Sequence, residues 1–513
     1  MRNAIIVCLL LVAAFNSCTK INYTTDSSDV LEFSKDTIMF DSVFTTIGSI
    51  TMPFTVINSH SEALLIDEIS LEGGSDSQYR INVDGQGENP DGSPLTSISD
   101  ITLLPGDSIF VFVEVTVDPT NNTSAFICED RIRFNTNTVD QFVDLIAYGR
   151  NAYFHHQSGN WFNPNNLPEQ ILDCNEVWTN DLPHVVYGPL MVEPGCSLTI
   201  EQGTEVYIHS GSGIWVRGGT INIEGTLANK VVIQGDRLDG SYPEQPGQYG
   251  LEIPLEYQLD GENVYVTVSR GGIWLDRAVN CNLNHTILKN GTIGMWVDSV
   301  ATGADYALKM TNTEISNMSA VGLLSQGGYI QGVNNLIADC GEACGAFTLG
   351  GEIVMHLSTF ANYWSSGTVR QGPSVYINDW YESAGGAVQH RPFTENTEFR
   401  SCIIWGNNAF LDEHDELTSN LLDPTFYNTL FNACAVDVQY EEFPLSILAE
   451  NCSTDEEPPF ANTISRDFRL ESNSSLWNGI SSIPPFTAAE VSMDLDGMPR
   501  STFSPDKGCY ERN

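Results

Sequence analysis

The sequence contains few basic residues. It has 22 Lys and Arg against 66 Asp and Glu, which gives a formal net charge of −44 at pH 7. A surface with this excess of negative charge repels phosphate groups, so nucleic acids and anionic lipid head groups are excluded as partners. The charge also weighs against a polyuronate substrate, unless calcium or a local basic patch intervenes.

Long apolar runs are missing as well. The stretch from Ala4 to Phe15 has 12 residues, too few to span a bilayer but suited to a signal peptide, which we expect over residues 1–17. Its end, Phe15-Asn16-Ser17-Cys18, resembles a bacterial lipoprotein signal. That resemblance implies a lipid on Cys18 that binds the membrane. An ordinary cleaved signal is the alternative. Residues 18–30 are polar and are interpreted as a tether.

Several catalytic motifs are absent, including the nucleophile elbow, the phosphate loop and His-Glu-x-x-His. Cysteines are present, and an oxidising envelope would permit disulfides. Cys174 and Cys196 lie 22 residues apart, whereas Cys340 and Cys344 could clip a turn. The sequence does not fix the connectivity, and buried free thiols are an equal alternative.

What the sequence does contain is a short apolar motif that recurs between about residues 280 and 435. Its centres, which are Ile287, Ile315, Ile337, Phe360, Ile404 and Phe431, lie 28, 22, 23, 44 and 27 residues apart. A period of 20 to 30 residues predicts a solenoid, in which each repeat buries its apolar face by stacking on the next.

A second short element lies between these centres. It begins at Gly272, Gly294, Gly322 and Gly345, and turn-forming residues bound each copy. Two or three short strands per repeat, without a helical stripe, indicate a parallel β-helix. A leucine-rich repeat is the rival fold, but its leucine spacing and Asn ladder do not appear. About twelve coils are expected.

Residues 31–150 have a different texture. Alternating segments such as 108–115 are separated by turns such as Leu104-Pro105-Gly106-Asp107, which predicts an antiparallel β-sandwich of about seven strands. The run resembles the Ig-like domains that precede larger modules in Bacteroidetes surface proteins. We interpret residues 151–184 as a linker or N-terminal cap, and we expect the β-helix over 185–480.

The β-helix region resembles a known family. Its beginning, residues 192–204, and its last part, Met493–Arg500 and Pro505–Glu511, resemble the right-handed parallel β-helix lipoproteins of Bacteroidetes with a choice-of-anchor closing motif. Residues 481–513 would be this closing segment, with Cys509 in place of the usual Ala. The resemblance implies an all-β chain, an Ig-like sandwich followed by a right-handed β-helix, at the outer membrane, on the cell surface or the periplasmic face.

Two clusters are candidate sites. The first combines aromatic side chains, which stack on sugar rings, with an acid, an imidazole and a guanidinium. It consists of Trp380, Tyr381, Glu382, His390 and Arg391. The second offers carboxylates that suit calcium, the one cofactor considered. It consists of Asp412, Glu413, Asp415 and Glu416 around His414. A small satellite core and a solvated acidic loop are the simpler alternatives.

No repeated pair of acids is recognisable. Asp339 aligns with Asn317 and Asn362, which predicts a polar ladder at a corner. Arg270, Arg277 and Lys289 are not accompanied by a matching acid group. We therefore expect a lipid-anchored envelope protein that binds or scaffolds a glycan or a protein. The alternatives are a polysaccharide lyase or glycoside hydrolase that uses the β-helix groove, and a structural subunit of an outer-membrane complex.

Overall fold

The computed structural model divides the chain into two compact units, Met1–Asn151 and Ala152–Asn513. The structure describes residues 21–512, except 121–122, 157–169, 240–241, 260–261, 367–368, 371, 384–385, 408–414, 428–429, 439–446, 449–450, 455–456, 472–475, 477–484 and 503–504. Cys18 and the predicted signal peptide lie outside the described residues.

The first unit is a sandwich of two sheets. One sheet contains, in order, β1 (Glu32–Phe33), β3 (Met52–Ile57), β7 (Ser108–Val115) and β5 (Tyr79–Val83). The other contains β2 (Thr37–Phe44), β9 (Val139–Arg150), β8 (Phe126–Thr136), β4 (Leu64–Leu71) and β6 (Ser97–Leu103). A short 3-10 helix, η1 (Gly74–Asp76), follows β4.

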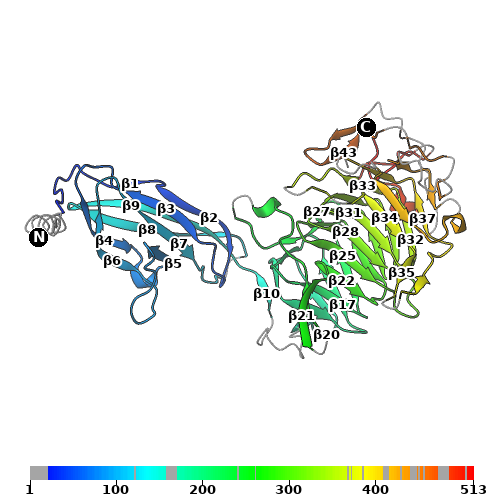
Figure 1. The fold of residues 1–513 in the computed structure, drawn as a ribbon, viewed down its shortest axis with the longest axis horizontal. Coiled ribbons are helices and arrows are strands. Elements are labelled where there is room, and N and C mark those ends of the chain that lie inside the picture. Colours follow the sequence, from blue (N-terminus) through cyan, green and yellow to red (C-terminus); the bar gives the residue numbers. More distant parts are fainter. Residues whose placement is uncertain are drawn as a thin grey trace, which may run out of the picture. The chain divides into compact units, whose positions relative to one another are not determined.

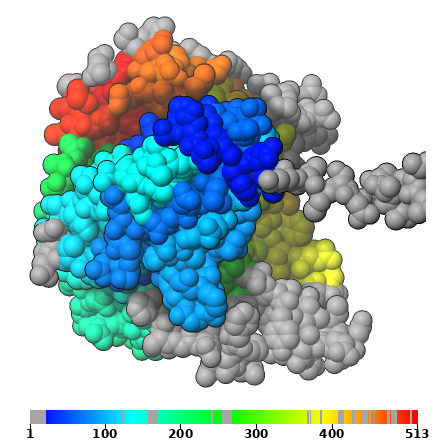
Figure 2. Space-filling model, turned by 90° about the vertical axis from the view of Figure 1, so that its left-hand side faces the viewer, coloured from blue at the N-terminus to red at the C-terminus, as the bar shows by residue number. Residues whose placement is uncertain are grey.

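Alternation of apolar and polar residues places one core between these sheets. In β7 the side chains of Ile109, Val111, Val113 and Val115 are buried. Figure 2 shows the sandwich residues, blue to cyan, packed as a continuous surface. The two sheets have nine strands among the described residues, against about seven expected. β1 has only two residues and β6 exposes most of its side chains, so both have a weak sequence signal.

The second unit is a parallel β-helix built from three sheets (Figure 1). We name each sheet by its first strand. The β10 sheet contains β10 (Tyr153–His156), β13 (His184–Tyr187), β16 (Glu205–Ile208), β19 (Val231–Gly235), β24 (Thr286–Lys289), β27 (Glu314–Met318), β30 (Leu336–Cys340), β33 (Thr359–Asn362), β38 (Ile403–Gly406) and β41 (Ala435–Val436).

The two remaining sheets have nine strands each. The β11 sheet contains β11 (Gln170–Ile171), β14 (Pro189–Val192), β17 (Gly213–Arg217), β22 (Ile273–Asp276), β25 (Ile293–Asp298), β28 (Val321–Gln326), β31 (Ala343–Thr348), β34 (Val375–Asn378) and β39 (Leu417–Asn420). The β12 sheet contains β12 (Glu176–Trp178), β15 (Ser197–Glu201), β18 (Thr220–Glu224), β23 (Cys281–Asn284), β26 (Leu308–Thr311), β29 (Tyr329–Val333), β32 (Glu352–His356), β37 (Glu398–Arg400) and β40 (Phe431–Asn432).

Smaller elements leave the coils. They are the antiparallel hairpins β20 (Glu252–Leu259) with β21 (Glu262–Ser269), β35 (Trp380–Glu382) with β36 (Val388–His390), and β42 (Phe460–Asn462) with β43 (Asp467–Leu470), the 3-10 helices η2 (Tyr242–Glu244) and η3 (Pro424–Phe426), and the helix α2 (Ala488–Val491). Among the described residues, no helix is long and apolar enough to cross a membrane.

The β-helix is displaced from the predicted range. Its first coil already begins at Tyr153, because β10, β11 and β12 pair in parallel with the strands of the next coil. Its last described strand in the β10 sheet is β41, which ends at Val436. That sheet has ten strands rather than the twelve coils expected. Residues 252–269 and 380–390 form hairpins instead of coils, and parallel bridges from Phe431 to Leu448 and from Ala435 to Ser453 continue the stack beyond β41.

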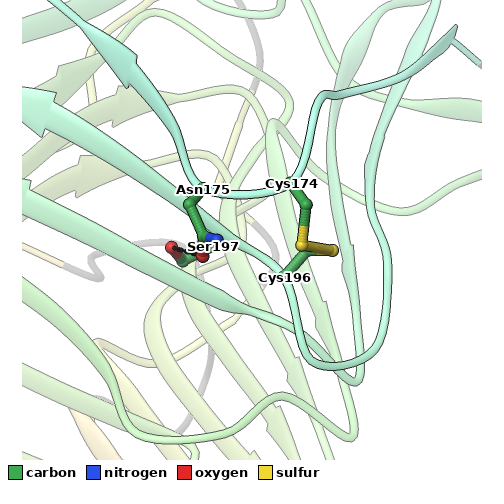
Figure 3. Close-up of a disulfide and its surroundings, with 4 residues drawn as sticks. All are labelled: Cys174, Asn175, Cys196 and Ser197. Atoms are coloured by element: carbon green, nitrogen blue, oxygen red, sulfur yellow. Dashed lines mark hydrogen bonds between the residues drawn. A yellow bond between two sulfur atoms is a disulfide. The ribbon is translucent and has the colours of Figure 1, made fainter.

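A disulfide joins the first two coils. Cys174 and Cys196 are bonded, and their Cα atoms lie 4.7 Å apart, one strand spacing. The adjacent residues are also in contact, because the Ser197 hydroxyl donates a hydrogen bond to Asn175 (Figure 3). The 22-residue spacing therefore places these cysteines on neighbouring coils. Cys340 and Cys344, by contrast, are buried free thiols.

The predicted polar ladder is present at a corner of the coils. The Asn317 amide donates to Asn290 at 2.8 Å. The guanidinium of Arg466 bridges Asn317 and Asp339, at 2.8 Å to each. Asn362 belongs to the same corner, since its carbonyl oxygen accepts from the backbone of Cys340. The fold uses these groups except the side-chain nitrogen of Asn362, which is buried without a partner among the described residues.

Candidate functional site

The first candidate cluster lies on the hairpin β35–β36, which leaves the β-helix directly after β34. Trp380 is opposite His390 and Glu382 is opposite Val388, so these four side chains share one face of the hairpin. Tyr381 pairs with Gln389 and points to the other face. The structure thus brings Trp380, Glu382 and His390 together and separates Tyr381 from them.

A buried carboxylate orients His390. The side chain of Asp379 is fully buried, and its Oδ2 lies 2.8 Å from Nε2 of His390, which is 32% exposed. The Tyr427 hydroxyl donates to the same oxygen at 3.0 Å, and the Leu422 backbone donates to Oδ1 at 2.8 Å. Burial, and then Asp379, raise the pKa of Tyr427. A carboxylate that fixes an imidazole in this way leaves the other ring nitrogen for a ligand.

Trp380 is fixed at its polar end. Its indole nitrogen donates to the Asn420 side chain at 3.2 Å, and its backbone N–H donates to Oδ1 of Asn378 at 3.3 Å. Arg391 is exposed, and its guanidinium lies so close to Gly327 that a Cβ there would be 2.9 Å from Nη2. Arg391 therefore extends from the hairpin to Gly327, which follows β28, two strands before β34 in the β11 sheet.

A row of polar side chains continues from this hairpin across the coils. Register pairs Asp276 with Asp298, Asp298 with Gln326, Gln326 with Thr348, and Asn378 with Asn420. Thr348 and Asn378 are equivalent, because Phe347 and Ile377 before them are paired. We call these six residues the polar strip. They lie on the outer face of the β11 sheet. The residues directly before them, such as Leu275 and Val297, belong to the buried core, and successive side chains of a strand point to opposite faces.

The strip contains the pair of acids that the sequence did not reveal. Asp276 and Asp298 are in register on neighbouring strands. Arg277 contacts Asp276 through two nitrogens, at 2.9 and 3.3 Å. Burial, and then the carboxylate of Asp276, raise the pKa of Asp298. The expectation that no acids accompany Arg270 and Arg277 is therefore wrong. The repeated segments that the sequence pattern defines have four residues, and each ends one residue before its acid.

A second row, of apolar side chains, lies beside the strip on the same face. Trp215, Trp274 and Trp296 are in register, and the rings of Trp215 and Trp274 stack at 4.7 Å between centroids. Arg270 lies over Trp274 at 5.3 Å and over Trp296 at 4.6 Å. The three indole nitrogens are buried without a hydrogen-bond partner among the described residues.

Of the four predicted calcium ligands, the structure describes Asp415 and Glu416. Asp412 and Glu413 lie outside the described residues. Glu416 is fully buried and accepts two bonds from Arg370, at 2.5 and 2.7 Å, and two from Ser374. The carboxylate of Glu416 is thus used by the fold, and Asp415 is buried beside it. In the part of the chain that the structure describes, no group of three or more potential ligands could hold a metal ion.

His155, in β10, lies beside two rings and an acid. Its Nε2 lies 2.9 Å from Nδ1 of His184, and its ring stacks on Trp178. Glu176 lies 4.0 Å from its Nδ1. The three rings stack on one another, so His155 has a structural role at the start of the β-helix. Burial lowers the pKa of His184 to about 4.

Two cavities lie away from the hairpin. One, of about 960 Å³, is on the sandwich and is lined by residues including Arg80 and Glu114. The other, of about 380 Å³, lies between the β12 sheet and α2, beside Lys309 and Glu490. Neither cavity is lined by the candidate residues.

No known protein family and no curated protein matches this chain. Among solved structures, it is similar to a family 123 glycoside hydrolase from Clostridium perfringens, with 14% identity over 28% of this chain and 26% of that one, at a TM-score of 0.17. It is also similar to the E. coli chaperone DraB (12% identity, 25% and 57% covered, TM-score 0.16) and the periplasmic chaperone SfaE (11%, 24% and 58%, 0.16). The chain thus spans less than two thirds of each, and likenesses this slight bear on neither fold nor function.

Proposed function

We propose that this protein is a lipid-anchored envelope protein that binds a neutral polysaccharide through the hairpin β35–β36 and the polar strip. The observation that supports this is the position of Trp380. It lies beside the oriented imidazole of His390 and contacts Asn420, which is part of the strip. An aromatic ring next to a row of hydrogen-bonding side chains is suited to sugar rings, which present apolar faces and hydroxyl edges.

The row fits an extended polymer better than a small molecule. Its members are one coil apart, about 4.8 Å, so a chain of sugars laid along the strip would meet a new polar side chain at each coil. The net charge of −44 favours a neutral glycan over an anionic one. The resemblance of the N-terminal segment to lipoprotein signals, and of the closing motif to Bacteroidetes β-helix proteins, supports the outer-membrane location within the same proposal.

A pair of variants on one hairpin tests the proposal. Trp380→Ala should weaken binding to the best polymer on a panel of xylan, mannan and soluble cellulose oligosaccharides by tenfold or more, because burying an aromatic side chain contributes about 1.5–3 kcal/mol. Tyr381→Ala is the matched control, since Tyr381 is 41% exposed on the opposite face, and it should change the affinity less than threefold. Binding by titration calorimetry measures both. If the parent protein binds none of the polymers, or if Tyr381→Ala loses as much affinity as Trp380→Ala, the proposal is wrong.

A further inference from the structure

We propose that Asp276 and Asp298 hydrolyse glycosidic bonds in the polysaccharide that the hairpin holds. This inference rests on the proposed function and assigns an activity to one part of the strip. It starts from the register of β22 and β25, which places both carboxylates on the same outward column of neighbouring coils.

The register fixes the scale of the pair. Adjacent parallel strands lie about 4.8 Å apart, and residues directly opposite on one face carry their side chains at a similar separation. Glycosidases that retain the anomeric configuration have carboxyl groups about 5–5.5 Å apart, whereas inverting enzymes need about 6.5–9.5 Å to admit a water molecule. The pair therefore matches the retaining geometry.

The two carboxyl groups have different surroundings. Arg277 forms a two-point ion pair with Asp276, which suits an ionised nucleophile. Asp298 is half-buried next to that negative charge, and it accepts a long hydrogen bond, of 3.3 Å, from the Ser299 hydroxyl. Two acids whose environments differ in this way can divide the roles of nucleophile and general acid.

A second observation on the same face points to a ligand. Trp274 precedes Asp276 by two residues and Trp296 precedes Asp298 by two, so each tryptophan shares a strand face with an acid. Both side chains are more than nine-tenths buried, and neither indole N–H has a partner among the described residues. Buried donors without partners are rare in folded proteins. Arg270 lies over both rings. Sugar hydroxyls are acceptors that would satisfy such donors.

The acids also lie where a chain held at the hairpin would pass. From Asn378, which supports Trp380, three steps along the strip lead through Thr348 and Gln326 to Asp298. At one strand spacing per step this is about 14 Å. The hairpin would hold one part of the polymer while the acids act on a bond a few sugars away.

The reaction consumes only water. Asp298 donates its proton to the glycosidic oxygen as the bond from that oxygen to the anomeric carbon breaks, and the Asp276 carboxylate forms an ester with the anomeric carbon. Asp298, now ionised, then takes a proton from water. The resulting hydroxide attacks the anomeric carbon, the ester bond breaks, and Asp276 is released as a carboxylate.

The experiment measures reducing ends released from the polymer that the parent protein binds best, and follows the anomeric configuration of the first product by NMR. Asp298→Asn and Asp276→Asn should each lower kcat by about 100-fold or more. Asp305→Asn, an exposed acid of the same β-helix, is the matched control and should leave kcat unchanged. Thermal melting of each variant checks that it is folded.

The outcomes separate this inference from the proposed function. Release of product with retained configuration, lost in the two variants and kept in Asp305→Asn, supports it. Binding without product release by the parent overturns the hydrolysis and leaves the binding function intact. Product release that survives Asp298→Asn, or that inverts the configuration, overturns the assignment of the residues. Absence of binding overturns both.

Discussion

Two rows of polar side chains cross the coils, and they differ in what their groups contact. At one corner, Asn317 bonds to Asn290, and Arg466 bonds to both Asn317 and Asp339 within the fold. The polar strip on the β11 sheet has the same one-per-coil spacing, but its acids meet an exposed arginine and each other. A row whose groups bond to one another within the fold contributes to stability, whereas a row on the outer face of a sheet is available to a ligand.

The largest expected effect is a loss of stability when Arg466, which bonds to the corner residues, is removed. Arg466→Ala should lower the free energy of unfolding by about 3–5 kcal/mol, because it leaves the buried carboxylate of Asp339 without its ion pair. Urea unfolding measures this loss. Arg469→Ala, on the same hairpin but 56% exposed, is the control and should cost less than about 1 kcal/mol. Equal losses in the two variants would mean that the corner residues do not form a stabilising network.

A pH titration tests whether His184, in the ring stack of the first coil, contributes to stability as the corner residues do. His184 has its pKa lowered to about 4 from 6.5, so the folded state disfavours the protonated form. Neutral His184 contributes fully to the free energy of unfolding above pH 6.5. This contribution, about 3 kcal/mol, is lost as the pH falls through the folded-state pKa. The measurement compares urea unfolding at pH 7 and pH 4 for the parent and for His184→Gln. A variant with the same pH dependence as the parent would show that His184 does not titrate in this way.

The smallest expected effect has the opposite sign and lies in the strip. Asp298→Asn should raise the free energy of unfolding by about 0.5 kcal/mol at pH 7, because like charges in register destabilise a sheet. The gain should vanish at acidic pH, where the raised pKa leaves Asp298 protonated in the folded parent. Thermal melts at the two pH values measure it. A loss of stability at pH 7 would show that Asp298 contributes to stability as the corner residues do.

The periodicity predicted the β-helix correctly because each coil repeats the same inward positions. Five of the six repeated centres lie in consecutive strands of the β10 sheet, from β24 to β38. The sixth, Phe431, lies in the β12 sheet, since apolar segments of neighbouring sheets look alike in sequence. The first coil was read as a linker because its strands β11 and β12 have only two and three residues.

The candidate site was predictable in part. Trp380 and His390 stood out as residue types, but the pairing that puts them on one face depends on the turn between β35 and β36. Asp379 was not singled out, because an acid before an aromatic pair carries no local signal of burial. Its role depends on Tyr427 and Leu422, which come from the next coil. Asp276 and Asp298 were in principle visible, since the alignment of Trp274 with Trp296 extends to them.

The closing segment joins residues that are far apart along the coils. Arg500 bonds to Asn334, the Cys509 backbone to Thr359, the Gly508 backbone to Ser401, and Lys507 to the carbonyl of Cys434. These contacts link four successive coils along the axis of the solenoid. Since the segment follows all the coils in the sequence, a ribosome releases it after them. During synthesis the coils therefore associate through contacts between neighbouring coils, and the closing segment binds along them as the last step.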